Sequence, residues 1–265
     1  MEAKKTIKNV VMLGAGSVAT HLALALQMHG YHVSQVYSRT SDSAKILSQR
    51  TSSGFITDLQ HLDTEADLYI IALKDSVVEC LIKKLFVKGI VVHTSGTLPM
   101  NILENMSRHY GVFYPLQTFS RSRPIRFDHI PICLEASDND TLEALQQVAA
   151  TLSDKIYMMD SGQRQYIHLA AVFSCNFSNF MYVAAAEVLR DHQISFDILI
   201  PLIREFFDKV TMMDPWEAQT GPAIREDRSI IAKQLELLQD YPEFREIYRQ
   251  ITEKIIERKK LESKS

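Results

Sequence analysis

The hydrophobic positions in the first 160 residues change period repeatedly along the chain. Short β-branched and aliphatic runs at 9–13, 32–38, 67–73 and 90–95 alternate with amphipathic stretches. The runs predict buried strands, and the stretches, whose apolar residues recur every three or four positions, predict helices over 18–30 and from residue 42 onward. This alternation predicts a chain of βαβ units.

The pattern becomes purely helical after about residue 160. Strand-like runs at 111–116, 131–136 and 155–159 enclose a predicted helix over 141–152, and longer amphipathic stretches then cover 167–189, 196–212, 222–239 and 242–260. We therefore expect an α/β protein with two domains. Residues 1–160 form a doubly wound, Rossmann-like, mostly parallel sheet, and residues 161–265 form an all-helical domain.

Composition narrows the classes of partner. The 265 residues are 46% hydrophobic and carry a formal net charge of −3, so we expect no nucleic acid and no membrane as partner. The long apolar stretch at 167–189 holds Glu187 and several amide or imidazole groups, which makes insertion into a bilayer costly. The first 13 residues lack a secretory leader, and the three cysteines have no zinc spacing. These features predict a cytoplasmic protein without a metal site.

A glycine-rich turn joins the first predicted strand to the first predicted helix. In VVMLGAGSVATHLALAL, Gly14, Gly16 and Ala19 match the G-x-G-x-x-G/A pattern in the strand-to-helix context that it requires. The turn brings free helix N–H groups to an anion, which favours a dinucleotide. The expected cofactor contacts here are Gly14, Ala15, Gly16, Ser17, Val18 and Ala19. A glycine turn without a ligand is the alternative.

The end of the second predicted strand indicates which dinucleotide binds. NAD-binding chains usually place an acid here, whereas this chain has Ser38, Arg39 and Thr40. A guanidinium flanked by hydroxyls suits a 2′-phosphate. We therefore expect NADP, with a solvated loop arginine as the alternative for Arg39.

Ligands of doubly wound sheets lie beyond the carboxyl ends of the strands, which nominates two further loops. Leu73 and Lys74 follow one strand, and His93 and Ser95 lie at the end of the next. We expect Leu73, Lys74 and Ser95 to contact the cofactor and His93 to titrate near neutrality. A strand-end histidine bonded to backbone is an equally good interpretation of His93.

Polar residues interrupt the apolar stretch at 167–189. At about 100° per residue, His168, Val172, Cys175 and Asn179 share one stripe of a regular helix, with Asn176 at its edge. We expect Asn176 and Asn179 to contact a substrate amide or carbonyl, and His168 to act as acid/base or cofactor contact. The alternative is a set of satisfied amides packed against another helix or a second copy.

The stretch QTGPAIRED indicates an anion site. Gly221-Pro222 predicts a helix start, and Arg225 lies in its first turn, so N–H groups and a guanidinium could converge on a substrate carboxylate. The expected substrate contacts are Gln219, Thr220, Gly221 and Arg225. A capped surface helix is the alternative.

Seven motifs in order carry a resemblance to a known family: GAGSVA, ALKDSVV, VVHTSGT, FYPLQTFS, IPICLEA, HLAAVFSCNFSNFMY and QTGPAIRED. The chain resembles the bacterial family that joins a Rossmann-like NADP domain to a helical domain of unknown function, number 2520. That family is similar in layout to the 6-phosphogluconate dehydrogenase-like superfamily, which includes pyrroline-5-carboxylate reductase, ketopantoate reductase and the reductases that exchange hydride between NADP and coenzyme F420. The resemblance implies the fold and NADP, and no particular substrate.

One departure from that superfamily concerns the mechanism. Its hydroxyacid dehydrogenases carry Lys-x-x-x-Asn on the long helix, whereas Val172 and Cys175 stand four positions before Asn176 and Asn179. Lys209 is the candidate to replace the missing lysine, although its i,i+4 spacing to Glu205 is typical of a surface ion pair.

These observations together predict an NADP-dependent oxidoreductase that acts on a carbonyl or imine of a small carboxylated molecule. Three alternatives stay open: a non-catalytic NADP-binding sensor or scaffold, an NADP oxidoreductase acting on a deazaflavin, and a site for a nucleotide other than a dinucleotide. The long apolar helix has more faces than one sheet edge can cover, so we also expect a homodimer through the helical domain.

Overall fold

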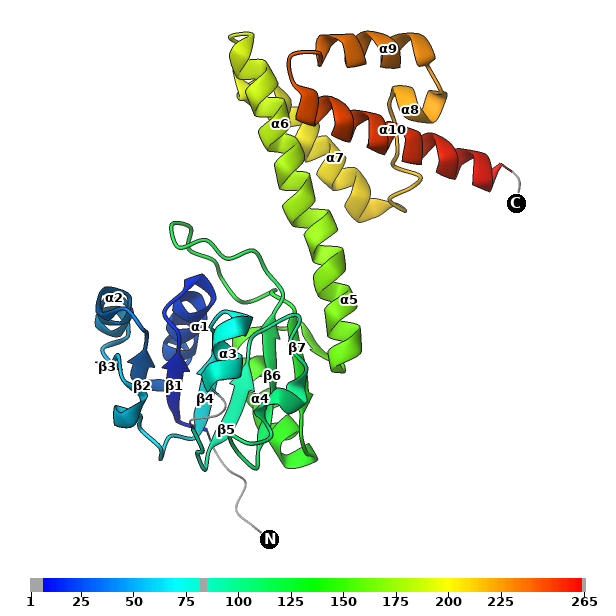
Figure 1. Ribbon diagram of the computed structural model, residues 1–265. Helices are drawn as coiled ribbons and strands as arrows, with labels where there is room; N and C mark the ends of the chain where they lie inside the picture. Colours follow the sequence, from blue (N-terminus) through cyan, green and yellow to red (C-terminus); the bar gives the residue numbers. More distant parts are fainter. Residues whose placement is uncertain (1–6, 82–84, 264–265) are drawn as a thin grey trace. The chain divides into compact units, whose positions relative to one another are not determined.

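The computed structural model describes residues 7–81 and 85–263; residues 1–6, part of the start expected to lack a leader, lie outside this range. Eight strands form one sheet in the order β3-β2-β1-β4-β5-β6-β7-β8 (Figure 1). The strands are β1 (Asn9–Leu13), β2 (His32–Tyr37), β3 (Gly54–Ile56), β4 (Leu68–Ile71), β5 (Ile90–His93), β6 (Tyr110–Pro115), β7 (Ile132–Ala136) and β8 (Ile156–Met158). Short β3 is the strand that the hydrophobic pattern did not predict.

All neighbouring strands of the sheet pair in parallel except β6 and β7, which are antiparallel. The chain leaves β1 toward β2 and β3 on one side and returns to place β4 on the other side of β1. The order of strands therefore reverses between β1 and β4, where doubly wound sheets bind ligands. The predicted doubly wound, mostly parallel sheet is confirmed.

Helices connect the strands and cover both faces of the sheet. They are α1 (Ser17–Met28), α2 (Ser41–Thr51), α3 (Asp75–Leu81) and α4 (Asn139–Leu152), with short 3₁₀ turns at Leu59–His61 and Met100–Leu103. Alternate residues of β1 enter two separate cores: Val10 and Met12 pack with α1 and α4, and Val11 and Leu13 pack with α3. This two-sided burial explains the continuous apolar runs of the strands.

The chain divides into two compact units, residues 1–176 and 177–265. α5 (Ser161–Ala171) follows β8 and belongs to the first unit, although the predicted helical domain begins at residue 161. A π-helical segment (Val172–Phe177) comes next. The remaining helical elements are α6 (Ser178–Asp191), a 3₁₀ turn (Phe196–Leu199), α7 (Ile200–Met212), α8 (Pro222–Arg225), α9 (Arg228–Leu237) and α10 (Pro242–Glu262).

Two of the predicted helices are divided in the structure. The single helix expected over 222–239 is wrong, because Glu226 adopts a left-handed backbone (φ 55°) and Asp227 starts α9 by accepting a hydrogen bond from the Ile230 N–H. The helix expected over 196–212 begins as a 3₁₀ turn and becomes α-helical at Ile200, beside Pro201, whose missing N–H suits a helix start.

Residues 161–191 form one helical span, α5 to α6, that has a mean hydropathy of 1.3 over its most apolar window. By length and composition alone, this span of the described chain could cross a membrane. A single such helix is weak support for a membrane protein, because helices that pack in the core of a soluble protein have the same composition.

Candidate functional site

Parallel pairing brings the carboxyl ends of four strands to one edge of the sheet. Leu13, the last residue of β1, pairs with Tyr37 of β2 and with Ile71 of β4, and Ile71 pairs with His93 of β5. The loops 14–16, 38–40, 72–74 and 94–98 therefore start side by side. Together with the first turn of α1, they carry the residues expected to contact a cofactor, apart from His168 on α5.

Gly14 lets the turn after β1 pass close to the end of β4. Its φ of 132° is a conformation that L side chains rarely adopt, and a Cβ would stand 2.3 Å from the carbonyl oxygen of Ala72. The Gly14 N–H donates to the Tyr37 carbonyl oxygen at 2.8 Å, which ties the turn to β2 as well. Leu73 lies against the same turn, with its Cδ2 3.4 Å from that Cβ position.

Gly16 leaves the start of α1 open. It precedes the helix with an extended backbone and no side-chain cap, and a Cβ built on it would have no atom within 4 Å. The backbone N–H groups of Ser17, Val18 and Ala19 belong to the first turn of this 12-residue helix, where N–H groups lack intrahelical acceptors. Open space beside Gly16, at a helix start whose first N–H groups lack intrahelical acceptors, fits a phosphate group.

The loop after β2 adds hydroxyls and one positive charge. Ser38 Oγ lies 3.4 Å from Thr40 Oγ1, and Arg39 between them is exposed. Thr40 precedes α2, whose first turn contains Asp42. Lys74 is exposed beyond the end of β4. Arg39 and Lys74 are thus accessible on the two loops that flank the glycine turn after β1, where an anionic ligand would meet them.

The loop after β5 is held in shape by Ser95. Its Oγ accepts hydrogen bonds from the Thr97 and Leu98 N–H groups, both at 3.0 Å. The Ser95 N–H donates to Nδ1 of His93 at 3.1 Å. Because the hydroxyl accepts twice, its own proton can still be donated, and Thr97 Oγ1 lies 3.2 Å away.

Side chains on one polar face of α5 hydrogen-bond to the segment that follows β5. Asp160 caps the helix in a reciprocal pair with Gln163, which fixes where α5 begins. Ser161, Arg164, Gln165 and His168 then follow at the i, i+3, i+4, i+7 spacing of one helix face. Ser161 Oγ accepts from the Met100 N–H at 2.9 Å, and Gln165 Nε2 donates to the Thr97 carbonyl oxygen at 2.8 Å.

Arg164 is the most deeply buried charge of this face, with 1% of its side chain exposed. Its Nε donates to the Ser95 carbonyl oxygen at 3.1 Å, and its terminal nitrogens donate to the Leu98 carbonyl oxygen and to Glu135 on β7. The Glu135 side chain is 16% exposed and also accepts from Ser161 Oγ. One ion pair therefore locks the loop after β5, α5 and β7 together.

His168 lies one turn further along α5 and packs directly on Gly96. A Cβ on Gly96 would stand 2.5 Å from His168 Nδ1, so only glycine fits beneath the ring. The same Nδ1 is 3.0 Å from the hydroxyl of Tyr114 on β6. Burial raises the pKa of Tyr114 to about 12, so its phenol stays protonated near neutral pH.

His93 lies inside the sheet. The ring is fully buried, and burial, reinforced by the positive charge of Arg164, lowers its pKa to about 4 although the Pro99 carbonyl opposes this in part. The expectation that His93 titrates near neutrality is therefore wrong. With Nδ1 accepting from Ser95, the ring is neutral and its proton is on Nε2.

The stripe expected on the long helix does not continue as predicted. Hydrogen bonds in the π-helical segment reach one residue further than in an α-helix, so the rotation per residue changes between His168 and Asn179. Asn176 and Asn179 are both exposed, in the first and second units respectively. Lys209 is half-buried on α7.

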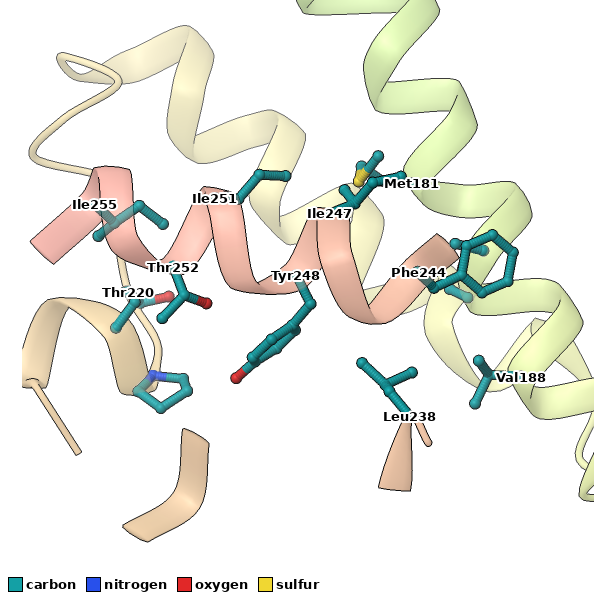
Figure 2. A pocket seen from close by; sticks show the side chains of 14 residues that line it. Met181, Val188, Thr220, Leu238, Phe244, Ile247, Tyr248, Ile251, Thr252 and Ile255 are labelled. Atoms are coloured by element: carbon teal, nitrogen blue, oxygen red, sulfur yellow. The ribbon is translucent and has the colours of Figure 1, made fainter. Parts of the chain in front are cut away.

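The second unit contains an apolar cavity of about 380 Å³ between α6, α8 and α10 (Figure 2). Phe244, Ile247 and Ile251 of α10 line it together with Met181 of α6, and Thr220 lies at one end. The other residues expected to bind a carboxylate are close to Thr220 along the chain. Gln219 Nε2 donates to the Thr220 carbonyl oxygen, Gly221 precedes α8 with a φ of 106°, and Arg225 is exposed at the end of this single helical turn.

Sequence reasoning missed Tyr114, Glu135, Arg164 and also Arg121, whose Nη2 donates to the Ala15 carbonyl oxygen. Arg164 had a signal, because it stands four residues before His168 on a capped helix. Tyr114 and Glu135 lie within apolar strands, where no local pattern distinguishes them from core residues.

Comparisons with known proteins agree with this fold. A family model described as a Rossmann-like domain matches residues 2–117, and the model of domain of unknown function 2520 matches residues 130–255. A candidate NADP oxidoreductase from Bacteroides fragilis is 44% identical, with a TM-score of 0.90, over 95% of this chain and 98% of that one. No curated protein sequence matches.

Two more distant structures share the fold. The imine reductase from Myxococcus stipitatus, in complex with NADP⁺, is 14% identical with a TM-score of 0.65, over 97% of this chain and 94% of that one. The 1-pyrroline-5-carboxylate reductase from Streptococcus pyogenes is 12% identical with a TM-score of 0.63, over 95% and 98%.

Proposed function

This chain belongs to the family that joins a Rossmann-like domain to domain of unknown function 2520, and from that premise we propose a cytoplasmic NADP-dependent oxidoreductase. Its substrate is a small carboxylated molecule with a carbonyl or imine carbon. The observation that carries the proposal is the pair of His168 and Tyr114, placed on Gly96 at the sheet edge that also holds the glycine turn.

The choice of cofactor rests on the residues of that edge. The open space over Gly16 and the free amides at the start of α1 suit a diphosphate. Arg39, exposed between two hydroxyl residues after β2, suits the 2′-phosphate that distinguishes NADP from NAD. The relatives named for NADP support the same choice.

When NADPH is bound, it supplies the hydride. We assign the proton to His168, whose protonated ring gives the proton on Nε2 to the substrate nitrogen or oxygen as carbon is reduced. The Tyr114 hydroxyl can accept from Nδ1–H or donate to Nδ1, so it holds the ring before and after transfer. Ser95 and the buried Arg164 keep the loop under the ring in place.

The proposed substrate contacts are Asn176, Asn179, Gln219, Thr220, Gly221 and Arg225. Amide groups suit a carbonyl or imine, and Arg225 suits a carboxylate. Lys209 stays a candidate proton carrier.

We also propose a homodimer through the helical unit. Among the described residues after Asn176, only Ala218, Ala223 and Thr252 are buried, while Ile198, Leu202 and Phe207 are each more than 60% exposed. Apolar surface of this extent is typical of an interface. Light scattering should give twice the 30.2 kDa of one chain, and Phe207→Asp should lower that mass while Asp208→Ala does not. A wild-type mass of one chain overturns the dimer.

The function is tested first by binding and then by turnover. Binding is measured by nicotinamide fluorescence. We expect NADPH to bind more tightly than NADH, and Arg39→Ala to weaken the binding of NADPH but not that of NADH. Cyclic imino acids and 2-keto acids are then screened for oxidation of NADPH, with His168→Ala as the inactive control. NADPH binding without turnover across the panel favours the sensor alternative, and no binding of either nucleotide overturns the proposal.

A further inference from the structure

The β6–β7 loop, residues 116–131, extends from the sheet to the start of α1 (Figure 1). Its two ends are joined by the Leu116 N–H, which donates to the Pro131 carbonyl oxygen at 2.8 Å. Phe119 and Phe127 stack inside it with ring centroids 5.9 Å apart. The loop is therefore an ordered structure with its own packing.

His21 on α1 holds the tip of this loop. The imidazole is 8% exposed, its Nε2 donates to the Ser120 carbonyl oxygen at 2.8 Å, and its ring lies 5.4 Å from the ring of Phe119. Since α1 is the helix whose N-terminus follows the glycine turn, this contact sets the distance between the loop and the turn.

Arg121 follows Ser120 and reaches the turn itself. Its Nη2 donates to the carbonyl oxygen of Ala15, between Gly14 and Gly16, at 2.8 Å. A guanidinium has five N–H donors, so four remain. In the described part of the chain, no carboxylate pairs with Arg121. An exposed positive charge is thus fixed beside the free amides of α1 and the open space over Gly16.

We propose that Arg121 binds the diphosphate bridge of the dinucleotide and that the β6–β7 loop covers it. The inference rests on the proposed NADP function and adds to it a binding residue from outside the βαβ unit. A guanidinium matches phosphate oxygens in a bidentate fashion, and the Ala15 carbonyl keeps the fork directed at the turn. Arg39 and Arg121 therefore bind different phosphates of one ligand.

The test compares NADPH and NADH binding by nicotinamide fluorescence in wild type, Arg39→Ala, Arg121→Ala and Arg123→Ala. Both nucleotides contain the diphosphate, so Arg121→Ala should weaken both by about tenfold and leave their ratio unchanged. Arg39→Ala should weaken NADPH alone. Arg123→Ala also removes one positive charge from this loop, and it should change the affinity for neither nucleotide. Hydrogen exchange of amides 117–123 should slow when NADP⁺ is added to wild type.

Three results overturn this inference and leave the proposed function standing. They are an unchanged nucleotide affinity in Arg121→Ala, an equal loss of affinity in Arg123→Ala, and no slowing of hydrogen exchange at amides 117–123 when NADP⁺ is added. A loss confined to NADPH in Arg121→Ala also overturns it, since the residue then binds the 2′-phosphate. Failure of wild type to bind either nucleotide overturns the proposed function and this inference with it.

Discussion

The hydroxyl of Tyr114 lies 3.0 Å from Nδ1 of His168, and the two residues come from β6 and α5, 54 positions apart in the chain. Gly96 lies beneath the imidazole, so the ring is held from its edge by a hydrogen bond and from below by backbone. A ring held in this way presents Nε2 in a fixed direction. Such fixed orientation is what a proton donor needs.

Loss of either residue should slow NADPH-dependent reduction without changing nucleotide affinity. We expect His168→Ala to lower kcat by roughly 100-fold or more, and Tyr114→Phe by about tenfold, the worth of one hydrogen bond. The ring ¹⁵N signals of His168 should shift in Tyr114→Phe. Tyr110→Phe, on the same strand, is the control and should change neither. Unchanged kcat and ring signals in Tyr114→Phe would remove Tyr114 from the site.

Substitution of the two glycines in the turn after β1 should affect different properties: Gly14 the stability of the fold, and Gly16 the binding of NADPH. Gly14→Ala meets the Ala72 carbonyl and a φ of 132°, so we expect the free energy of unfolding to fall by about 1–3 kcal/mol. Gly16→Ala meets no atom and should fold like wild type, yet its methyl group enters the proposed phosphate space and should weaken NADPH binding. Urea unfolding and fluorescence titration measure the two effects. Equal NADPH binding by Gly16→Ala and wild type contradicts the placement of the diphosphate.

The buried ion pair of Arg164 and Glu135 should be a main determinant of stability in the first unit. Arg164→Met leaves Glu135 without its positive partner and removes a donor from the carbonyls of Ser95 and Leu98, so we expect the free energy of unfolding to fall by about 3–5 kcal/mol. The double variant with Glu135→Gln should lose less than the sum of the single variants. Additive losses in urea unfolding would show that the two side chains are not coupled.

The sequence predicts the sheet and the glycine turn after β1 well, because both depend on local signals. A β-branched run followed by Gly14 and Gly16 identifies β1 and the start of α1 without knowledge of the rest of the fold. The contacts that shape the proposed site join distant segments: the Tyr114 hydroxyl lies beside His168, and Arg121 reaches Ala15 from a loop 106 positions away. The prediction of a polar stripe around Asn179 extended a regular helix through a π-helical segment that composition does not reveal. The same helical reasoning, applied one turn earlier, would have found Arg164.

His93 should make folding sensitive to acid. Its pKa is about 4 in the folded chain against about 6.5 when unfolded, because burial and the Arg164 charge disfavour the protonated ring. Between these values the unfolded chain binds a proton that the folded chain does not, so stability is complete above pH 6.5 and falls as the pH drops toward 4. The expected loss is about 3 kcal/mol. Urea unfolding of His93→Gln from pH 7.5 to 4.5 should show a flatter dependence than wild type, whereas His32→Gln, at an exposed histidine, should keep the wild-type slope. An unchanged slope in His93→Gln would assign the acid sensitivity to other groups.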